Sequence, residues 1–182
     1  DPELNSVELL VPQVLGGEPM ELDVCLQMLE GRGYKQVDIN MGCPFTMISR
    51  RGKGAGLLPH PERVEALMEV VKDFPEIQCS VKMRLGWEDP GECLKLLPLL
   101  NAAPLAAIFL HARVGVQEYK GEADKEAFEI FYKECEHPLY YNGDVLTLED
   151  IQAVTERFPR LEGVMIGRGL LACLLYTSDA AD

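Results

Sequence analysis

Residues 37–44 read VDINMGCP, an apolar strand in which Asp38 and Asn40 occupy alternate positions before the pattern breaks at Gly-Cys-Pro. This pattern predicts a buried strand followed by a loop that carries the thiol of Cys43. In parallel α/β proteins, chemistry is done at the carboxyl ends of strands. A lone cysteine is most often a small core residue, but its place in a loop favours a chemical role for Cys43, as a nucleophile or a proton donor.

The composition sets bounds on the class of protein. The chain has 182 residues, 47% of them hydrophobic, and a net charge of −13. This length suffices for one domain with a core, and no apolar run approaches the roughly 20 residues of a membrane-spanning helix. Taken alone, the acidic charge argues against nucleic-acid binding. The six cysteines form no C-x-x-C pair, which argues against a zinc site or a disulfide framework and favours a reduced, cytoplasmic setting.

Strand-like and helix-like segments alternate along the chain. The strand candidates are Leu9–Leu15, Val37–Met41, Ser80–Leu85, Ala107–Ala112, Leu139–Asn142 and Gly163–Ile166. The helix candidates lie near Met20–Glu30, Glu62–Phe74, Gly91–Leu100, Lys125–Cys135 and Leu148–Phe158. Before the last of these, Thr147 followed by Asp150 is typical of a capping box. Regular alternation of this kind predicts a parallel sheet covered by helices.

The polar residues of the strands distinguish two architectures, an open six-stranded sheet and a truncated barrel. Lys82 and Arg84 share one side of their strand, His111 and Arg113 share one side of the next, and Asn142 ends the strand after that. In a barrel, such side chains converge at one mouth, and a polar ligand there would explain groups that are costly to bury without partners. A complete barrel needs about 250 residues. We therefore expect a truncated (β/α)8 TIM barrel with about six of its eight strands.

Two glycine-containing tripeptides end consecutive strands. They are Asn142-Gly143-Asp144 and Gly167-Arg168-Gly169. Asn-Gly is also a hairpin signal, but a helix follows it here. Glycines let backbone N–H groups approach a ligand closely, and in eight-stranded barrels the loops after the last two strands commonly hold a phosphate. Together the tripeptides predict a site for a phosphate-bearing cofactor.

A short basic segment follows the Cys43 loop. It contains Arg50, Arg51 and Lys53. A solvated loop is the default interpretation, but its position also suits contact with a polyanionic substrate. The sequence contains neither G-x-G-x-x-G nor a P-loop, so it gives no support to a Rossmann or nucleotide-hydrolase assignment.

Five motifs follow one another along the chain. They are Asp38-Ile-Asn-Met-Gly-Cys-Pro44, Val81-Lys-Met-Arg-Leu-Gly86, His111-Ala-Arg113 with Gln117, Tyr119, Gly121 and Ala123-Asp124, Tyr141-Asn-Gly-Asp144, and Gly163-Val-Met-Ile-Gly-Arg168. Together they resemble the motifs of the tRNA-dihydrouridine synthases, which are FMN-dependent enzymes, and the resemblance runs from about Val11 to Ala172. It implies an FMN-binding α/β barrel followed by a small helical domain, and the NADPH-dependent reduction of a uridine in tRNA to 5,6-dihydrouridine.

The resemblance also implies roles for individual residues. Cys43 matches the cysteine that protonates C5 of uracil after the flavin gives hydride to C6. The residues that match contacts to the flavin ring and ribityl chain are Gln13, Lys82 and His111. Those that match the phosphate site are Asn142, Gly143, Asp144, Gly167 and Arg168. The expected substrate contacts are Asn40, Arg50, Arg51, Lys53 and Arg113.

The sequence departs from this family at both ends. The family's first two strands and its helical domain are absent, which offers one account of an acidic chain from an RNA-modifying enzyme. We interpret residues 1–172 as a partial FMN-binding barrel and Cys173–Asp182 as a non-native tail.

The alternatives are another FMN barrel acting on a free pyrimidine, similar to dihydroorotate dehydrogenase, or an inactive fragment that binds FMN or RNA. We expect a monomer with tRNA as its partner, without a metal ion and without a membrane.

Overall fold

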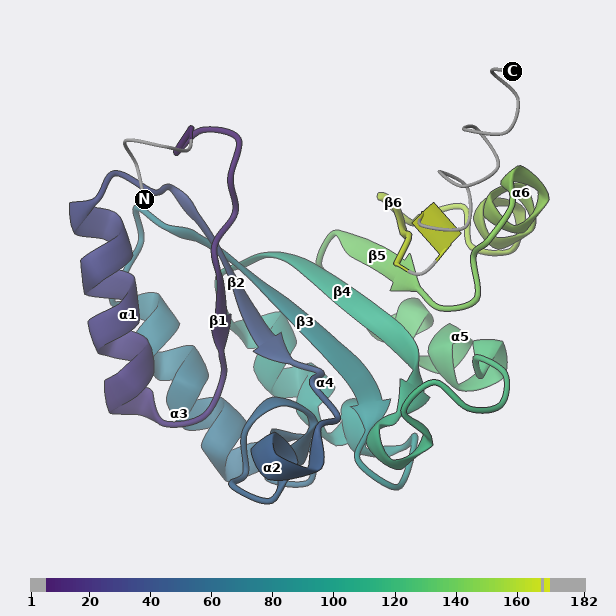
Figure 1. Cartoon of the computed structure of the whole chain (residues 1–182), viewed down its shortest axis with the longest axis horizontal. Coiled ribbons are helices and arrows are strands. Elements are labelled where there is room, and N and C mark those ends of the chain that lie inside the picture. Colours follow the sequence, from purple (N-terminus) through teal and green to yellow (C-terminus); the bar gives the residue numbers. More distant parts are fainter. Residues whose placement is uncertain (1–5, 168, 171–182) are drawn as a thin grey trace, which may run out of the picture.

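The computed structural model describes residues 6–167, 169 and 170, and these residues contain a six-stranded parallel sheet (Figure 1). The strands are β1 (Gln13–Leu15), β2 (Gln36–Met41), β3 (Gln78–Gly86), β4 (Leu105–Val114), β5 (Leu139–Asn142) and β6 (Gly163–Met165). Each strand pairs with the next one along the chain. A doubly wound sheet reverses its strand order at a switch point, whereas a barrel keeps the order sequential. The truncated barrel that the sequence predicts is therefore confirmed.

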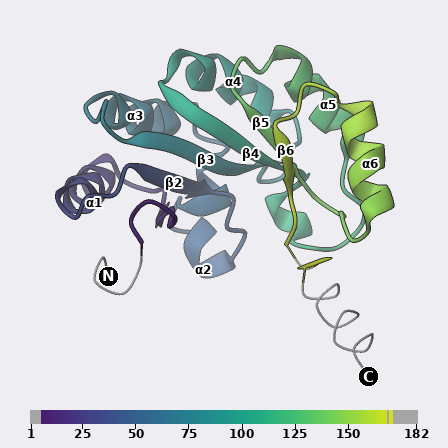
Figure 2. The same cartoon turned by 90° about the horizontal axis from the view of Figure 1, so that it is seen from above.

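At least one helix separates each strand from the next along the chain. They are α1 (Pro19–Gly31), α2 (Thr46–Ser49), α3 (Pro61–Lys72), α4 (Glu92–Ala102), α5 (Lys125–Glu134) and α6 (Leu148–Arg157), with 3₁₀ turns η1 (Gly54–Leu57) and η2 (Gly115–Gln117). Figure 2 shows that α1, α3, α4, α5 and α6 follow one another around the same side of the curved sheet. The short helix α2 lies beyond the carboxyl end of β2 (Figure 1).

The expected elements lie within a few residues of the observed ones, and the first strand differs most. It was expected from Leu9 but begins at Gln13. Pro12 has no N–H to donate to a ladder, although its carbonyl still accepts a hydrogen bond from the N–H of Asp38 at 2.9 Å. The capping box before α6 is confirmed, because Thr147 Oγ1 accepts from the N–H of Asp150 and the Asp150 carboxylate accepts from the N–H of Thr147.

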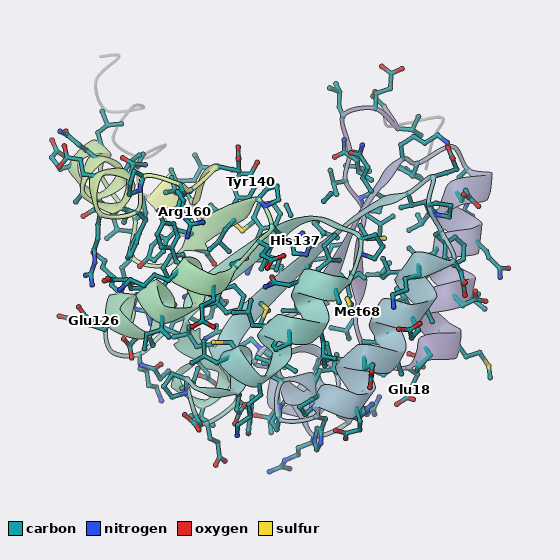
Figure 3. The ribbon with its side chains drawn as sticks, turned by 180° about the vertical axis from the view of Figure 1, so that it is seen from behind. Glu18, Met68, Glu126, His137, Tyr140 and Arg160 are labelled. Carbon is teal, nitrogen blue, oxygen red and sulfur yellow. The ribbon has the colours of Figure 1, made fainter. Side chains whose placement is uncertain are left out.

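One side chain in two along each central strand enters the core between sheet and helices. The fully buried residues of β2, β3 and β4 on this side are Val37, Ile39, Met41, Cys79, Val81, Met83, Leu85, Ile108, Leu110 and Ala112. In the view from the helix side, Met68 of α3 lies among the helices, whereas Glu18 and Glu126 point away from the molecule (Figure 3). The alternate positions of the same strands carry the polar residues, so the sheet's other face carries the chemistry.

An aromatic cluster supports the carboxyl end of β5. The ring of Phe128 from α5 packs edge-on against Tyr141 of β5 at a centroid distance of 4.8 Å, and against Phe158 at 5.0 Å. All three side chains are buried. Aromatic pairs of this geometry add about 0.5–1.5 kcal/mol beyond their buried area. The cluster therefore anchors the strand from which Asn142, Gly143 and Asp144 follow.

Candidate active site

A cavity of about 590 Å³ lies at the carboxyl ends of β2 to β6. This volume falls within the range of small-molecule and cofactor sites. The convergence of polar residues that the strand pattern predicts is confirmed, since most of them line this one cavity. Its lining residues are Asn40, Gly42, Cys43, Pro44, Lys82, Arg84, His111, Arg113, Tyr119, Asn142, Gly143, Asp144, Val145, Leu146, Met165, Ile166, Gly167 and Gly169.

The register of the sheet brings the polar side chains together. Asn40 of β2 is paired with Lys82 of β3, and Arg84 of β3 is paired with His111 of β4. His111 is in turn paired with Asn142 of β5. Residues paired in register on parallel strands point to the same face of a sheet. Five side chains from four strands thus form one continuous polar surface.

The Cys43 loop is held by hydrogen bonds on several sides. The N–H groups of Gly42 and Cys43 both donate to Oδ1 of Asn40, at 3.0 and 2.9 Å. The carbonyl of Gly42 accepts from Nε of Arg84 at 3.0 Å, and the carbonyl of Cys43 accepts from the N–H of Ala55 at 3.0 Å. These bonds fix the backbone on both sides of Cys43. This half-buried residue therefore has a defined position on the cavity wall.

Asn40 and Gln13 belong to the same network. The amide of Asn40 donates through Nδ2 to Oε1 of Gln13 at 2.8 Å, and Gln13 donates to the carboxylate of Asp38 at 2.6 Å. Asn40 therefore uses both ends of its side chain within the protein, while it also lines the cavity. Gln13 does not line the cavity, and reaches it through Asn40. Their roles as substrate and flavin contacts stay predictions.

Lys82 presents a positive charge to the cavity. No carboxylate or carbonyl oxygen among residues 6–167 lies within hydrogen-bonding distance of its ammonium group. Burial lowers the pKa of Lys82, as does the neighbouring Arg84 guanidinium, and Asp38 and Cys43 oppose this shift. A partly desolvated cation that lacks a protein partner is suited to an anionic or electron-rich ligand group.

His111 is a neutral group in this site. Its side chain is buried, and Nε2 lies 3.2 Å from Nη1 of Arg113. Because a guanidinium can only donate, Nε2 accepts and the ring proton belongs on Nδ1. Burial lowers the pKa of His111 to about 3, and the cations Arg84, Lys82 and Arg113 act in the same direction. At neutral pH His111 can therefore donate or accept hydrogen bonds but carries no charge.

Arg113 and Asp144 form an ion pair in the cavity wall, in which the guanidinium is buried and the carboxylate is partly exposed. Nη2 of Arg113 lies 2.7 Å from both carboxylate oxygens of Asp144 and 2.6 Å from the carbonyl of Gly121. Asp144 also accepts from the N–H of Ala123 at 2.8 Å. The sequence suggests a substrate contact for Arg113 and a phosphate contact for Asp144. The geometry gives each of them a structural partner as well, since the pair connects β4 and β5 to the loop at 121–123.

The two glycines of the expected phosphate site, Gly143 and Gly167, both line the cavity. Gly143 has φ +141°, a conformation that L side chains rarely adopt. At Gly167 no heavy atom lies within 4 Å of the point where a Cβ would stand. Asn142 donates through Nδ2 to the carbonyl of Met165 at 2.8 Å, which ties the two strand ends together. Arg168, the charged member of the predicted site, lies outside the described residues.

Two residues to which the sequence analysis assigned no individual role, Arg84 and Tyr119, are part of the site. Arg84 is only 2% exposed, and its Nη1 donates to the carbonyls of Val114 and Glu118 at 3.0 and 2.7 Å. Its guanidinium carbon lies 5.5 Å from the ring centroid of Tyr119, which also lines the cavity. The strand pattern predicts that Arg84 faces the barrel mouth together with Lys82, and its place in the cavity lining confirms this.

The basic segment lies outside the cavity. The ammonium of Lys53 forms an ion pair with Glu21 of α1, so its charge is already matched. Arg50 and Arg51 are exposed at the end of α2 and in the turn that follows it. None of the three lines the cavity. Their expected contact with the substrate would therefore take place at the molecular surface, next to the Cys43 loop.

A larger hollow of about 1240 Å³ lies at the opposite end of the strands, near His137, Arg160 and the start of β5 (Figure 3). Its polar side chains bond to the main chain: His137 to the carbonyl of Leu100 at 2.8 Å, and Arg160 to that of Tyr132 at 2.6 Å. Active sites of α/β barrels lie at the carboxyl ends of the strands. The smaller cavity around Cys43 is therefore the candidate active site.

The sequential sheet and the polar cavity at its carboxyl ends define an α/β-barrel protein with a ligand site. The family model described as dihydrouridine synthase (Dus) matches residues 2–173. The chain therefore belongs to the dihydrouridine synthase family. This finding confirms the resemblance on which the residue assignments were based.

Curated relatives agree with this membership. The chain is 28% identical over 160 residues to tRNA-dihydrouridine synthase B of Pasteurella multocida (strain Pm70), a match that covers 87% of this chain and 48% of the relative. It is 32% identical over 185 residues to the probable tRNA-dihydrouridine synthase 1 of Synechocystis sp. (strain ATCC 27184 / PCC 6803 / Kazusa), covering 93% and 51%. The chain thus spans about half the length of the curated relatives it matches.

Solved structures of similar shape support the fold alone. An old yellow enzyme homologue from Zymomonas mobilis has a TM-score of 0.58 at 15% identity, over 82% of this chain and 47% of that one. A dihydrodipicolinate synthase also has a TM-score of 0.58, at 12% identity, over 86% and 55%. Within the described part of the chain, no helix is long and apolar enough to cross a membrane, and no group of three or more His, Cys, Asp or Glu side chains could hold a metal ion.

Proposed function

We propose that this chain is the flavin-binding catalytic part of a tRNA-dihydrouridine synthase, which uses NADPH to reduce a uridine in tRNA to 5,6-dihydrouridine. The observation that carries the proposal is that Cys43, Lys82 and His111 line one cavity in a chain of the dihydrouridine synthase family. A thiol is not needed for binding alone, whereas the reduction of a C=C bond needs a proton donor.

The cavity fits FMN in size and in chemistry. Its volume suits a cofactor, Lys82 offers a cation that has no hydrogen-bond partner in the described part of the chain, and the space at Gly167 leaves room for a phosphate beside the backbone. When bound, FMN would take hydride from NADPH and deliver it to C6 of the uracil. We propose that Gln13, Lys82 and His111 hold the flavin ring and ribityl chain. The proposed phosphate site comprises Asn142, Gly143, Asp144, Gly167 and Arg168.

The residues of this chain would control the proton. As hydride reaches C6, negative charge develops at C5 and on the neighbouring carbonyl oxygen, and the Cys43 thiol donates its proton to C5. The resulting thiolate lies in a site that contains the cations of Lys82 and Arg84, which would stabilise it. His111, being neutral, would contribute hydrogen bonds rather than charge.

The polyanionic substrate would approach the face that carries the Cys43 loop. Arg50 and Arg51 are exposed there, and we propose that they contact tRNA phosphates, with Asn40 and Arg113 nearer the base. Lys53 is the weakest candidate because it is paired with Glu21. The five described cysteines are free thiols, in keeping with a proposed cytoplasmic location.

We further propose that residues 1–172 are part of a longer FMN-binding barrel, and that residues 173–182 are not native sequence. Two features support the first part. The chain spans about half the length of its relatives, and apolar residues of β1 and α1, among them Leu15, Val24 and Met28, are exposed where a further unit would pack. The sequence of the complete gene tests both parts directly.

The test uses the protein expressed from its complete gene. Visible absorbance and chromatography of the released cofactor should identify FMN, and NADPH with unmodified tRNA should yield dihydrouridine, measured by mass spectrometry of tRNA nucleosides. The variant Cys43→Ala should keep its flavin and lose dihydrouridine formation, whereas Cys25→Ala, a half-exposed cysteine of α1, should behave as the wild type.

Three results would contradict the proposal. A folded protein without flavin would remove the mechanism, and a fully active Cys43→Ala variant would remove the proton-donor role. Activity on free dihydroorotate or uracil, without activity on tRNA, would replace the proposed substrate with a free pyrimidine.

A further inference from the structure

A line of hydrogen bonds leads from β3 to the Cys43 loop. Ser80 Oγ donates to Oδ1 of Asp38 at 2.8 Å, and Gln13 Nε2 donates to Oδ2 of Asp38 at 2.6 Å. Asn40 Nδ2 then donates to Oε1 of Gln13 at 2.8 Å, and Asn40 Oδ1 accepts from both loop N–H groups. We call this set the Asp38 relay; its members are Ser80, Asp38, Gln13, Asn40 and the N–H groups of Gly42 and Cys43.

The two ends of the Asp38 relay have opposite and fixed hydrogen-bonding character. At one end both carboxylate oxygens of Asp38 accept, and at the other the backbone N–H groups of Gly42 and Cys43 can only donate. The side-chain amides of Gln13 and Asn40 between them each have one donor and one acceptor end. Only one orientation of the two amides satisfies every group from within the relay, and it is the orientation observed.

The reverse orientation brings donors together. If Gln13 turned its oxygen toward Asp38, two acceptors would face each other there, and its NH₂ group would face the NH₂ group of Asn40. Asn40 would then have to turn as well and present NH₂ to the N–H groups of Gly42 and Cys43. Both N–H groups would lose their acceptor, and a buried N–H without one costs about 1–3 kcal/mol.

We propose that Asp38, which neither lines the cavity nor touches Cys43, is a positioning residue that fixes the backbone of the Cys43 loop through Gln13 and Asn40. Its effect on catalysis rests on the proposed function, whereas its effect on the loop does not. Asp38 is 8% exposed, and a buried carboxylate is costly unless it is hydrogen-bonded. Because both oxygens of Asp38 accept hydrogen bonds, they determine the donor-to-acceptor direction of the bonds from Gln13 to Asn40 and from Asn40 to the loop.

The register of the sheet builds the relay into the fold. Gln13 is paired with Asp38 across β1 and β2, and Asp38 is paired with Ser80 across β2 and β3. The three side chains therefore lie in a row across the strands on the cavity side of the sheet. Asn40 follows Asp38 by two positions, which places it on the same side and next to the loop.

The test measures amide hydrogen exchange at Gly42 and Cys43 in the protein expressed from its complete gene. The relay is broken in the double variant Asp38→Leu with Ser80→Ala, which leaves no buried hydroxyl without a partner. Exchange at the two N–H groups should accelerate about tenfold, because both lose their fixed acceptor. The alkylation rate of Cys43 by iodoacetamide, relative to that of Cys25 in the same sample, should change about threefold or more.

Two further variants separate positioning from general loss of structure. Asp38→Asn keeps an oxygen that can accept from Gln13, so it should restore most of the protection at Gly42 and Cys43. Ser80→Ala alone leaves the bonds of Asp38, Gln13 and Asn40 in place, and exchange in the loop should stay within about twofold of the wild type.

The outcomes decide between the alternatives. If exchange at Gly42 and Cys43 in the double variant matches the wild type, or rises equally throughout the sheet, Asp38 does not position the loop. These readouts need neither flavin nor tRNA. A failure of the proposed function would leave them unchanged, and a failure of the relay would leave the activity of the wild-type protein unchanged.

Discussion

The guanidinium of Arg113 and the carboxylate of Asp144 meet in the cavity wall, with Nη2 2.7 Å from each carboxylate oxygen. Arg113 is 2% exposed, whereas the side chain of Asp144 is about one-third exposed. The pair joins the end of β5 to the long loop after β4, because Asp144 also binds the N–H of Ala123. Two residues that the sequence suggests as ligand contacts are thus also partners of each other.

Asp144→Asn should lower the stability of the protein without changing its backbone conformation. Asparagine tolerates the positive φ of 34° at this position but leaves the buried guanidinium without its matching charge. We expect a loss of about 2 kcal/mol in the free energy of unfolding, less than for a fully buried pair because Asp144 is partly exposed. Urea unfolding measures this loss. Asp23 of α1 provides the control, because its carboxylate is partly exposed and accepts, among the described residues, only from the side chain of Gln27. Asp23→Asn should cost less than about 0.5 kcal/mol; equal effects of the two variants would contradict a structural role for the ion pair.

His111 should make the protein sensitive to acid. Its pKa is lowered from 6.5 to about 3 in the folded state, so between these values the unfolded chain binds a proton that the folded chain does not. Stability therefore falls as the pH drops through this window, by up to about 1.4 kcal/mol per pH unit. In His111→Gln the side-chain oxygen can still accept from Arg113, and this contribution should vanish. Urea unfolding of both proteins near pH 7.5 and near pH 4.5 checks the difference; equal acid sensitivity would show that His111 is not the responsible group.

Arg84 should hold the loop after β4 in place. It donates to the carbonyls of Val114 and Glu118, and Glu118 has an unusual φ of 53°. In Arg84→Met these bonds are lost, and trypsin should cleave after the exposed Lys120 about tenfold faster. Mass spectrometry of the peptides gives the rate at this bond.

Arg160 provides a matched control for that experiment. It also donates to a main-chain carbonyl, that of Tyr132, and lies 4.5 Å from the ring centroid of the same residue. Arg160→Met removes the same kinds of contact from an exposed arginine far from the loop, and it should leave cleavage after Lys120 unchanged. If both variants accelerate it alike, the effect reports global stability rather than the contact of Arg84 with the loop.

Gly54 should not tolerate a side chain. It has φ +57°, and a Cβ would lie 2.7 Å from the carbonyl oxygen of Cys43. Gly54→Ala should cost about 2–3 kcal/mol, in part from the backbone conformation and in part from displacement of the Cys43 loop. Gly33 has φ +87° with open space around it, so Gly33→Ala should show the conformational part alone, about 1 kcal/mol. Gly31→Ala in α1 should be neutral or slightly stabilising, and similar unfolding midpoints for all three variants would contradict the clash.

The alternation of strands and helices could be predicted from the sequence because it depends on local periodicity. Apolar residues at every second position identified β2, β3 and β4, and the pair Thr147 and Asp150 identified the start of α6. The convergence of Lys82 and His111 on one cavity could also be predicted, since the parity of a residue in a strand fixes the face on which it lies.

The partners of these side chains could not be predicted. Nothing local links Lys53 to Glu21, or Arg113 to Asp144, because these pairs are 32 and 31 positions apart. Arg84 was visible in the strand pattern, but its bonds to Gly42 and Glu118 depend on how two loops fold back over the strand. Partners of this kind depend on the conformation of loops, and loop conformation gives no periodic pattern of residues in the sequence.

The sequence by itself determined the class of fold, the motifs of the dihydrouridine synthase family and the set of polar residues at one end of the sheet, because each follows from the order and spacing of residues along single strands. The tertiary structure alone decided which of these groups bond to other residues of the protein and which present a charge to the cavity without such a partner. Asn40 and Arg113 have protein partners while Lys82 has none among the described residues. The reason is physical: hydrogen bonds and ion pairs act over about 3 Å, and only the register of neighbouring strands brings residues that are distant in the chain to that separation.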